Sequence, residues 1–357
     1  MAEAGLRTAT SADLPAAAEA LGLAPAALAP AVLDPWARVL VGEEGQVVLV
    51  RRQWTDEATA AAVVIRRAGV PLDHPAVLAA AAAWGCDRVR HLATGRCADV
   101  PLPPADAPLP ERFAHLAALA ATRVETAVAL AHDAGEARTK GDGSPALAAD
   151  AAAHDAAVGV LGALGVPVLS EESRDTVVAA GRPWVVLDPL DGTRNFAAGL
   201  PPWAFSAALV QEGRPVAGLV ADLSSGRRWA AVEGHGAVRD GVPVRTRPGG
   251  TVVVPSGPRG TAVAVPATAR RVRITGCTAV DLCLVADGAA AAWHDLDRGG
   301  THVHDVAGGL AVLLAAGGAV LADRGEPLRL APDTGALIRF VAAADEASAR
   351  ELLAALR

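Results

Sequence analysis

One stretch decides how this chain is interpreted: Asp188-Pro189-Leu190-Asp191-Gly192-Thr193-Arg194-Asn195-Phe196. The apolar segment before it, Trp-Val-Val-Leu at 184–187, predicts a buried strand that ends at Asp188. Two carboxylates then bracket a turn, and Gly192-Thr193 is predicted to open a helix. Close carboxylates repel one another unless a cation lies between them, and Mg²⁺ prefers oxygen ligands of this kind. Backbone N–H groups at a helix N-terminus suit an anion. The stretch therefore predicts a metal ion beside a phosphate group.

The composition of the chain excludes several kinds of partner. The 357 residues carry a formal charge of −7, which argues against nucleic acid or an anionic membrane as partner. The four cysteines, Cys86, Cys97, Cys277 and Cys283, lack metal or disulfide spacing and are predicted to be free thiols. No N-terminal signal pattern is evident. The apolar run 306–321 contains glycine pairs and predicts a helix, a stop and a strand. We expect a cytoplasmic protein without a membrane partner.

Prolines and hydrophobic patterns divide the chain into two parts. Residues 1–100 are predicted to form a small N-terminal α/β unit, whose role no motif assigns. Within it, 12–21 and 60–68 have helical character, and 37–52 predicts a β-hairpin. The proline cluster at 101–110 predicts a linker.

A larger unit is predicted from residue 111 to residue 357, with its two halves at about 111–250 and 251–357. A long helix at 111–136 and a second helix ending near Leu164 open it. Strands and helices then alternate, with segments expected at 166–169, 184–187, 204–210, 216–221, 272–275, 281–286, 308–314 and 319–321. This mixture indicates layered α/β packing.

Four acidic segments follow one another along this larger unit. They are Lys140 to Asp150, Ser170 to Ser173, the stretch 188–196, and His304 to Gly309. Taken singly, each has an ordinary explanation, such as a solvated turn, an exposed charge pair, or a helix N-cap at Asp305. Taken together with the segment 276–288, they resemble the inositol monophosphatase family of Mg²⁺-dependent small-molecule phosphatases.

The resemblance covers about residues 111–345 and implies both a fold and an activity. The implied fold is the layered α+β sandwich of inositol monophosphatase and fructose-1,6-bisphosphatase, here with the N-terminal unit added. The implied activity is hydrolysis of a small phosphorylated metabolite, such as an inositol, sugar or aminosugar phosphate. Two or three Mg²⁺ ions are implied, with Mn²⁺ as an alternative, and relatives of this kind are usually homodimers.

The resemblance also implies a set of metal ligands. Glu171, Asp188 and the carbonyl of Leu190 would hold a first ion, and Asp188, Asp191 and Asp305 would hold a second. A third, weaker ion would contact Glu171 through waters. Paired metals of this kind lower the pKa of a bound water and neutralise charge on the leaving oxygen.

The resemblance assigns further catalytic roles around Thr193. Its hydroxyl would hydrogen-bond Asp150 and position the water that attacks, a step in which Glu171 also takes part. The backbone N–H groups of Gly192 and Thr193 would hold the phosphate. Positioning and electrostatics carry phosphoryl transfer, so small displacements of these groups matter.

The segment before Asp305 is expected to determine the substrate. By resemblance, Asp295 is the best match for an acidic residue that contacts substrate hydroxyls, and Asp297 is the second. Arg298 offers a site for another anionic group. His304 stands where the family usually has Trp, so we place it in the substrate pocket wall. The pair His302-x-His304 is also compatible with a transition-metal site, although a packed loop histidine is the simpler interpretation.

Several alternative functions remain open at this point. A bisphosphate nucleotidase or a histidinol-phosphatase would use the same chemistry on another substrate. A catalytically silent relative, in which residues 1–100 bind a partner, belongs to a different class. The presence of every expected metal ligand argues against the silent relative.

Overall fold

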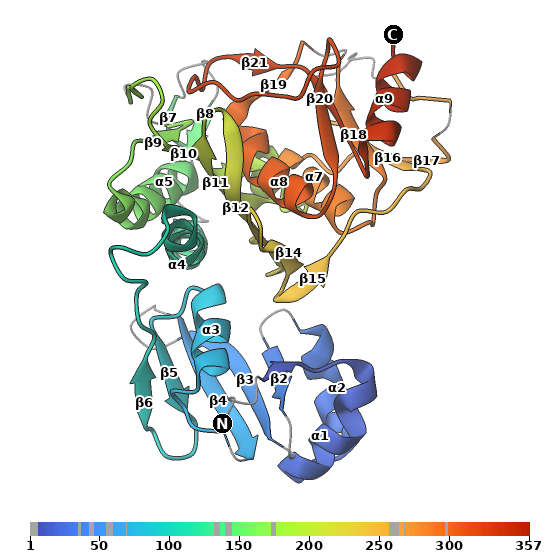
Figure 1. The fold of residues 1–357 in the computed structure, drawn as a ribbon. Coiled ribbons are helices and arrows are strands. Elements are labelled where there is room, and N and C mark those ends of the chain that lie inside the picture. Colours follow the sequence, from blue (N-terminus) through green and yellow to red (C-terminus); the bar gives the residue numbers. More distant parts are fainter. Residues whose placement is uncertain are drawn as a thin grey trace.

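The computed structural model describes residues 6–34, 37–42, 46–54, 60–68, 70–131, 136–139, 145–172, 176–256, 264–267, 269–296 and 299–357. The blue and cyan N-terminal part lies beside a larger layered part that runs from green to red (Figure 1).

The N-terminal part is built on a six-stranded sheet with helices on both faces. Its strands, in spatial order, are β1 (Arg7–Thr8), β2 (Ala37–Val41), β3 (Val47–Trp54), β4 (Ala60–Ala68), β5 (Arg88–His91) and β6 (Cys97–Asp99). Helices α1 (Leu14–Leu21) and α2 (Pro25–Leu33) cover one face, after the short helix η1 (Ser11–Asp13), and α3 (Pro75–Ala83) covers the other. Val39 and Val41 pack under α1 and α2, whereas Leu40 packs toward α3. This alternation follows from the two-residue period of a strand.

The structure corrects one element of the N-terminal unit and confirms two. The predicted helix at 60–68 is wrong, because these residues form β4, antiparallel to β3 and parallel to β5. The β-branched run 63–65 and pairing on both sides outweigh the helix propensity of the flanking alanines. The strands of the predicted hairpin pair as expected, and its turn at 43–45 lies outside the described residues. The predicted helix at 12–21 is present as η1 and α1.

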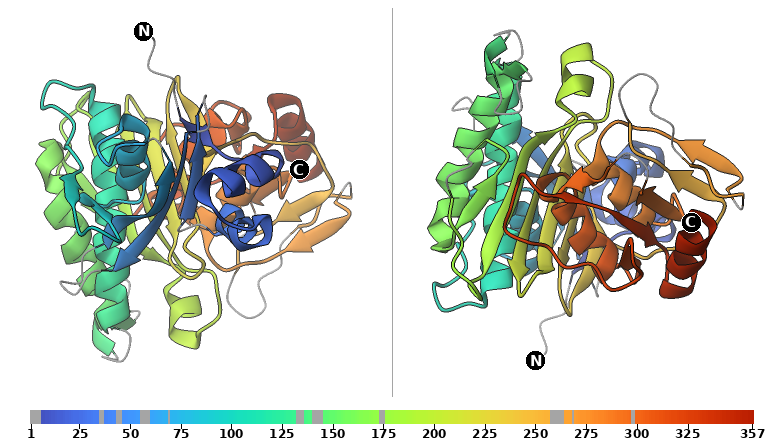
Figure 2. Two further views of the ribbon diagram at one scale, coloured as in Figure 1. Left: turned by 90° about the horizontal axis from the view of Figure 1, so that it is seen from below. Right: turned by 90° about the horizontal axis from the view of Figure 1, so that it is seen from above.

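The larger part alternates helical and sheet layers (Figure 2, right). Helices α4 (Leu109–Ala131) and α5 (Ala148–Leu161) form the first layer, and α5 continues into η3 (Gly162–Leu164). A seven-stranded sheet follows, with strands β15 (Val242–Val244), β14 (Gly236–Arg239), β13 (Arg228–Val232), β12 (Arg214–Asp222), β11 (Ala204–Gln211), β10 (Trp184–Asp191) and β9 (Val168–Ser170). Its neighbours are antiparallel except for β9 and β10, which are parallel.

Three further layers complete this part. Helices α7 (Thr278–Ala286) and α8 (Val303–Ala315) cover the other face of the seven-stranded sheet. A five-stranded sheet comes next, with strands β17 (Arg271–Arg273), β16 (Thr251–Val253), β18 (Ala292–Asp295), β22 (Phe340–Ala343) and β20 (Ala319–Ala322). Helix α9 (Glu346–Ala355) packs on its outer side. Two small ribbons join β7 (Glu136–Thr139) to β8 (Pro145–Leu147) and β19 (Thr301–His302) to β21 (Leu337–Ile338). The predicted layered α/β fold is confirmed.

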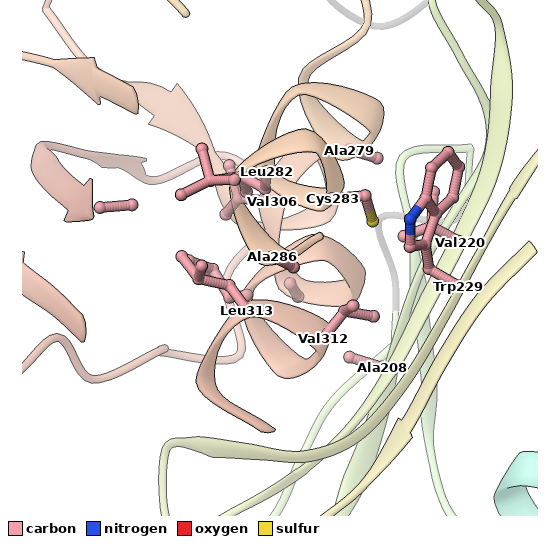
Figure 3. Close-up of a cluster of buried hydrophobic side chains, with 14 of the residues drawn as sticks. Ala208, Val220, Trp229, Ala279, Leu282, Cys283, Ala286, Val306, Val312 and Leu313 are labelled. Atoms are coloured by element: carbon pink, nitrogen blue, oxygen red, sulfur yellow. The ribbon is translucent and has the colours of Figure 1, made fainter. Parts of the chain in front are cut away.

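Helix α8 lies inside the molecule, and its composition reflects this. Figure 3 shows Val306, Val312 and Leu313 of α8 beside Leu282 and Cys283 of α7, with Trp229 on the adjoining sheet. A helix that is apolar on every side is expected where both sides are buried. The predicted sequence of helix, stop and strand over 306–321 is confirmed as α8 followed by β20.

Helix α4 differs from its prediction at both ends. It begins at Leu109, so Pro110 occupies its first turn, where a missing N–H costs no hydrogen bond. It ends at Ala131 rather than near 136, because Glu136 already belongs to β7. Among the described residues, α4 alone has the length and hydropathy of a membrane span, and half of its most apolar window is buried. Core helices share both properties, so this is weak evidence for a span.

Polar contacts join the N-terminal unit to α4 and β13. The Thr122 hydroxyl donates a hydrogen bond to the carbonyl oxygen of Trp84 at 2.6 Å. Arg52 of β3 and Arg228 of β13 both contact the same oxygen of Glu125, at 2.8 and 3.3 Å. Both arginine side chains are almost fully buried. The two parts of the chain therefore share a buried charged contact.

Candidate active site

Strand β10 brings Asp188 and Asp191 together through an irregularity. The strand runs through Asp191, further than predicted, and its ladder with β11 shifts register between Asp188 and Asp191. In a regular strand, residues three apart point to opposite faces. The irregularity lets one oxygen of each carboxylate take part in the same cluster, as a β-bulge near an active site often does.

Gly192 makes the turn that follows. Its φ is +85°, and a Cβ at this position would lie 3.0 Å from the carbonyl oxygen of Pro202. A residue with a side chain would be strained here. The chain then enters the short helix α6 (Thr193–Ala198). The amide of Asn195 donates to the carbonyl oxygens of Pro202 and Thr275, each at 2.8 Å, so this side chain fixes the turn.

Thr193 connects this turn to helix α5. Its hydroxyl lies 3.1 Å from Oδ1 of Asp150 and 3.0 Å from the carbonyl oxygen of Leu190, so its single proton has two acceptors. Asp150 is buried in the first turn of α5. The hydrogen bond that the resemblance implies between Thr193 and Asp150 is thus present.

Asp191 is held by the start of helix α7. Its Oδ2 accepts the N–H of Ala279 at 2.7 Å and the thiol of Cys277 at 3.2 Å. Helix N-termini stabilise negative charge. Burial, and then the neighbouring Asp305, nevertheless raise the pKa of Asp191 to about 7 in the metal-free chain. The protein groups alone do not neutralise this carboxylate, so a cation would stabilise it.

Asp305 reaches the site because α8 packs very closely. A Cβ on Gly308 would lie 2.5 Å from Oγ of Ser206 on β11, and one on Gly309 would lie 2.7 Å from Cβ of Leu282 on α7. The two glycines therefore allow α8 to lie between β11 and α7. The N-cap of α8 is His302, not Asp305; the Asp305 carboxylate instead accepts the Thr301 hydroxyl at 2.9 Å and the His302 N–H at 3.3 Å.

Two adjacent clusters of possible metal ligands share Asp188. Glu171, Asp188 and His304 form one, and Asp188, Asp191 and Asp305 form the other, with the ligand atoms of each cluster within 4.8 Å of one another. Every carboxylate predicted to hold metal is included. Oxygen donors that are mostly buried and mutually repulsive fit a divalent cation. The structure thus groups His304, which we predicted as a substrate contact and, with His302, as an alternative transition-metal site, with Glu171 and Asp188 among the potential metal ligands.

The remaining predicted residues lie as follows. Glu171 directly follows β9, and the Leu190 carbonyl lies beside Thr193. Asp295 is buried at the end of β18, opposite Phe340 of β22. Asp297, Arg298 and Lys140 lie outside the described residues. The substrate roles of Asp295, Asp297 and Arg298 therefore stay predictions.

No sequence motif assigns a role to two further groups at the site. The backbone N–H of Ala279 and the thiol of Cys277 both contact Asp191. Their segment, 276–288, contributed to the resemblance, but a backbone donor leaves no side-chain signal. Cys277, Cys283 and Cys86 are buried free thiols and Cys97 is an exposed one, as predicted for this composition.

Comparison with known proteins now identifies the family. The sequence profile of the inositol monophosphatase family matches residues 111–357. The chain belongs to the inositol monophosphatase family. A fructose-1,6-bisphosphatase/inositol-1-monophosphatase of Thermococcus kodakarensis is 32% identical over 210 residues, which cover 58% of this chain and 81% of that protein. A probable inositol 1-monophosphatase of Mycobacterium tuberculosis is 35% identical over 185 residues, covering 47% of this chain and 67% of that protein.

Other similarities are shorter or structural. The histidinol-phosphatase of Mycobacterium tuberculosis is 42% identical over 101 residues, covering 28% of this chain and 38% of that protein. An inositol monophosphatase structure from Anabaena superposes with a TM-score of 0.55 at 22% identity, covering 69% of this chain and 96% of that one. The family and its named relatives are phosphatases, so the chain is a phosphoric monoester hydrolase.

Proposed function

We propose that this family member is a divalent-metal-dependent phosphomonoesterase for a small phosphorylated metabolite, with Mg²⁺ as the default ion. The observation that carries this proposal is the pair of carboxylate clusters that share Asp188. Burial, and then the neighbouring Asp305, raise the pKa of Asp191 in the metal-free chain, as expected of ligands arranged around a cation. When bound, divalent ions would lower the pKa of a water and neutralise charge on the leaving oxygen.

The side chains of the chain itself then orient the reacting groups. Asp150 accepts the Thr193 hydroxyl and thereby fixes its oxygen, which is positioned to orient a water by hydrogen bonding. Ala279 and Cys277 both donate to Oδ2 of Asp191 and thereby fix the orientation of this carboxylate. We propose that the N–H groups of Gly192 and Thr193 hold the phosphate. Such preorganisation supplies most of the catalysis in phosphoryl transfer.

The substrate class that we propose is an inositol, sugar or aminosugar phosphate. Relatives named for inositol-1-monophosphatase and fructose-1,6-bisphosphatase activity support it, since they match along much of the phosphatase part. Histidinol phosphate is the second candidate, favoured by the 42% identity over 101 residues to a histidinol-phosphatase. That match spans less than half of the histidinol-phosphatase, so it ranks below the first class.

A substrate panel tests this proposal. Phosphate release is measured from inositol, sugar, aminosugar, nucleotide and histidinol phosphates, with Mg²⁺ and with EDTA. We expect EDTA-sensitive release, strongest for one class, and none from a matched Asp188→Asn variant. Release that persists in EDTA, or in Asp188→Asn, would contradict the proposal. Silence across the panel, together with an unchanged melting temperature when metal is added, would favour the catalytically silent alternative.

A further inference from the structure

His304 lies within the carboxylate site and gives one of its two clusters a nitrogen donor. We propose that His304 binds the ion held by Glu171 and Asp188, and that this cluster consequently prefers a divalent transition ion such as Mn²⁺ to Mg²⁺. This inference rests on the proposed function, because it concerns the ions that the phosphatase uses.

The imidazole of His304 is buried. One ring nitrogen of His304 lies with an oxygen of Glu171 and an oxygen of Asp188 within a mutual distance of 4.8 Å. Only 5% of the residue is exposed, and its Nδ1 is buried without a hydrogen-bond partner among the described residues. Buried polar atoms are nearly always paired, so a buried Nδ1 without such a partner, on a ring that lies with two carboxylates, requires an explanation. A bound cation would supply one.

Contacts on two sides fix the orientation of the His304 ring. The His304 imidazole stacks on that of His302, with centroids 5.1 Å apart and planes at 8°. Its Nε2 lies 3.5 Å from Oδ1 of Asp305, which belongs to the neighbouring cluster. Metal-binding histidines are commonly oriented by a carboxylate near the other ring nitrogen. His304 thus has the surroundings of a ligand as well as the position of one.

The two clusters differ in the donor atoms that they offer to an ion. Asp188, Asp191 and Asp305 offer oxygen only, whereas Glu171, Asp188 and His304 offer two oxygens and a nitrogen. Mg²⁺ is bound through oxygen and water in proteins, while imidazole suits transition ions. Because Mn²⁺ accepts both donor types, it is the appropriate probe. The two clusters are therefore expected to differ in ion preference.

Equilibrium dialysis tests whether the cluster that contains His304 prefers Mn²⁺ to Mg²⁺. Metal-free wild type, His304→Phe and His302→Phe are titrated with Mn²⁺ and separately with Mg²⁺. Phenylalanine keeps a stacked ring at either position, and His302→Phe is the matched control outside the clusters. We expect His304→Phe to weaken one Mn²⁺ site by about tenfold or more, with a much smaller change for Mg²⁺. His302→Phe should bind both ions like wild type, and equal Mn²⁺ affinity in all three proteins would overturn the proposal.

A direct measurement on the wild type does not depend on whether a variant folds. Pulsed EPR of the Mn²⁺-loaded protein, with isotopically labelled histidine nitrogen, should show hyperfine coupling to one histidine. The coupling should persist in His302→Phe and disappear in His304→Phe. Bound Mn²⁺ without this coupling, in a protein whose phosphate release is sensitive to EDTA, overturns the role of His304 alone. Failure to bind any ion, together with no phosphate release, overturns the proposed function instead.

Discussion

Two of the regions in which the described residues bury charge do so in opposite ways. At the active site, Asp191 lies beside other carboxylates, and its pKa is raised to about 7 by burial and by Asp305. At the contact with the N-terminal unit, Arg52 and Arg228 share Glu125 within the protein. Burial, followed by Arg52, lowers the pKa of Arg228 to about 10, and Glu125 partly compensates.

This difference separates a site for a ligand from a structural contact. The arginine contact includes a counter-charge from the protein itself, the Glu125 carboxylate that both guanidinium groups share. The carboxylate clusters bring like charges together in a mostly buried site, and a bound divalent cation would reduce their mutual repulsion. The arrangement predicts that changes at the carboxylate clusters affect activity and metal binding, and that changes at the arginine contact affect stability.

The largest effect is expected at the residue that both clusters share. Asp188→Asn removes a charge from each cluster, because Asp188 belongs to both. We expect the rate of phosphate release to fall by more than about 10²-fold, since even groups that only support a metal ligand contribute 10–100-fold. Circular dichroism should show an unchanged fold. A near-normal rate would show that Asp188 is not a ligand.

The next effect concerns stability at the arginine contact. Glu125→Ala leaves Arg52 and Arg228 buried without their shared carboxylate, which we expect to cost about 3–5 kcal/mol of unfolding free energy. Urea denaturation measures this, and Glu111→Ala, an exposed position on the same helix, is the control. If both variants unfold at the same urea concentration, the contact contributes nothing to stability.

The pH dependence of stability further distinguishes the carboxylate clusters from the arginine contact. The pKa of Asp191 in the metal-free fold, about 7, lies above its usual value of 3.8. Between about pH 4 and pH 7 the folded chain holds a proton that the unfolded chain has lost, so its stability falls as the pH rises through this window. The largest slope is about 1.4 kcal/mol per pH unit.

Urea midpoints between pH 5 and pH 8, measured in EDTA, check this dependence. Wild type should lose stability relative to Asp191→Asn as the pH rises, because asparagine does not titrate. Excess Mg²⁺ should remove the loss in wild type, since the bound ion favours the carboxylate. Parallel curves for the two proteins in EDTA would contradict the assignment of the raised pKa to Asp191.

The sequence predicted the carboxylate region far better than the arginine contact. The stretch 188–196 and its companion segments are local patterns whose spacing reports chemistry directly. Arg52 and Arg228 lie 73 and 103 positions from Glu125, and no local pattern announces such a pairing. Strand β4 was predicted as a helix for the same reason, because pairing with β3 and β5 decides its structure.

Within the site, side chains were predictable and backbone contacts were not. The four carboxylates that gather in the two clusters were all named from the sequence, whereas the N–H of Ala279 that holds Asp191 depends on where α7 begins. His304 was noticed as a departure from the family, but its burial beside Glu171 required the structure. Its role also depends on the close packing of α8, which the glycine pair permits but does not by itself specify.

The smallest expected effect is that of replacing Thr193, within the candidate active site. Thr193 contacts Asp150 and the Leu190 carbonyl through its hydroxyl, and neither of these two hydrogen bonds involves a carboxylate of the metal clusters. Thr193→Ala should therefore lower kcat by about tenfold, the equivalent of one hydrogen bond of 1–1.5 kcal/mol, while Mn²⁺ and Mg²⁺ affinities stay unchanged. Thr193→Ser keeps the hydroxyl and should recover most of the rate. Steady-state kinetics alongside equilibrium dialysis separates the two effects. A parallel loss of metal affinity in Thr193→Ala would mean that the hydroxyl holds the Leu190 carbonyl in place as a metal ligand rather than orienting a water.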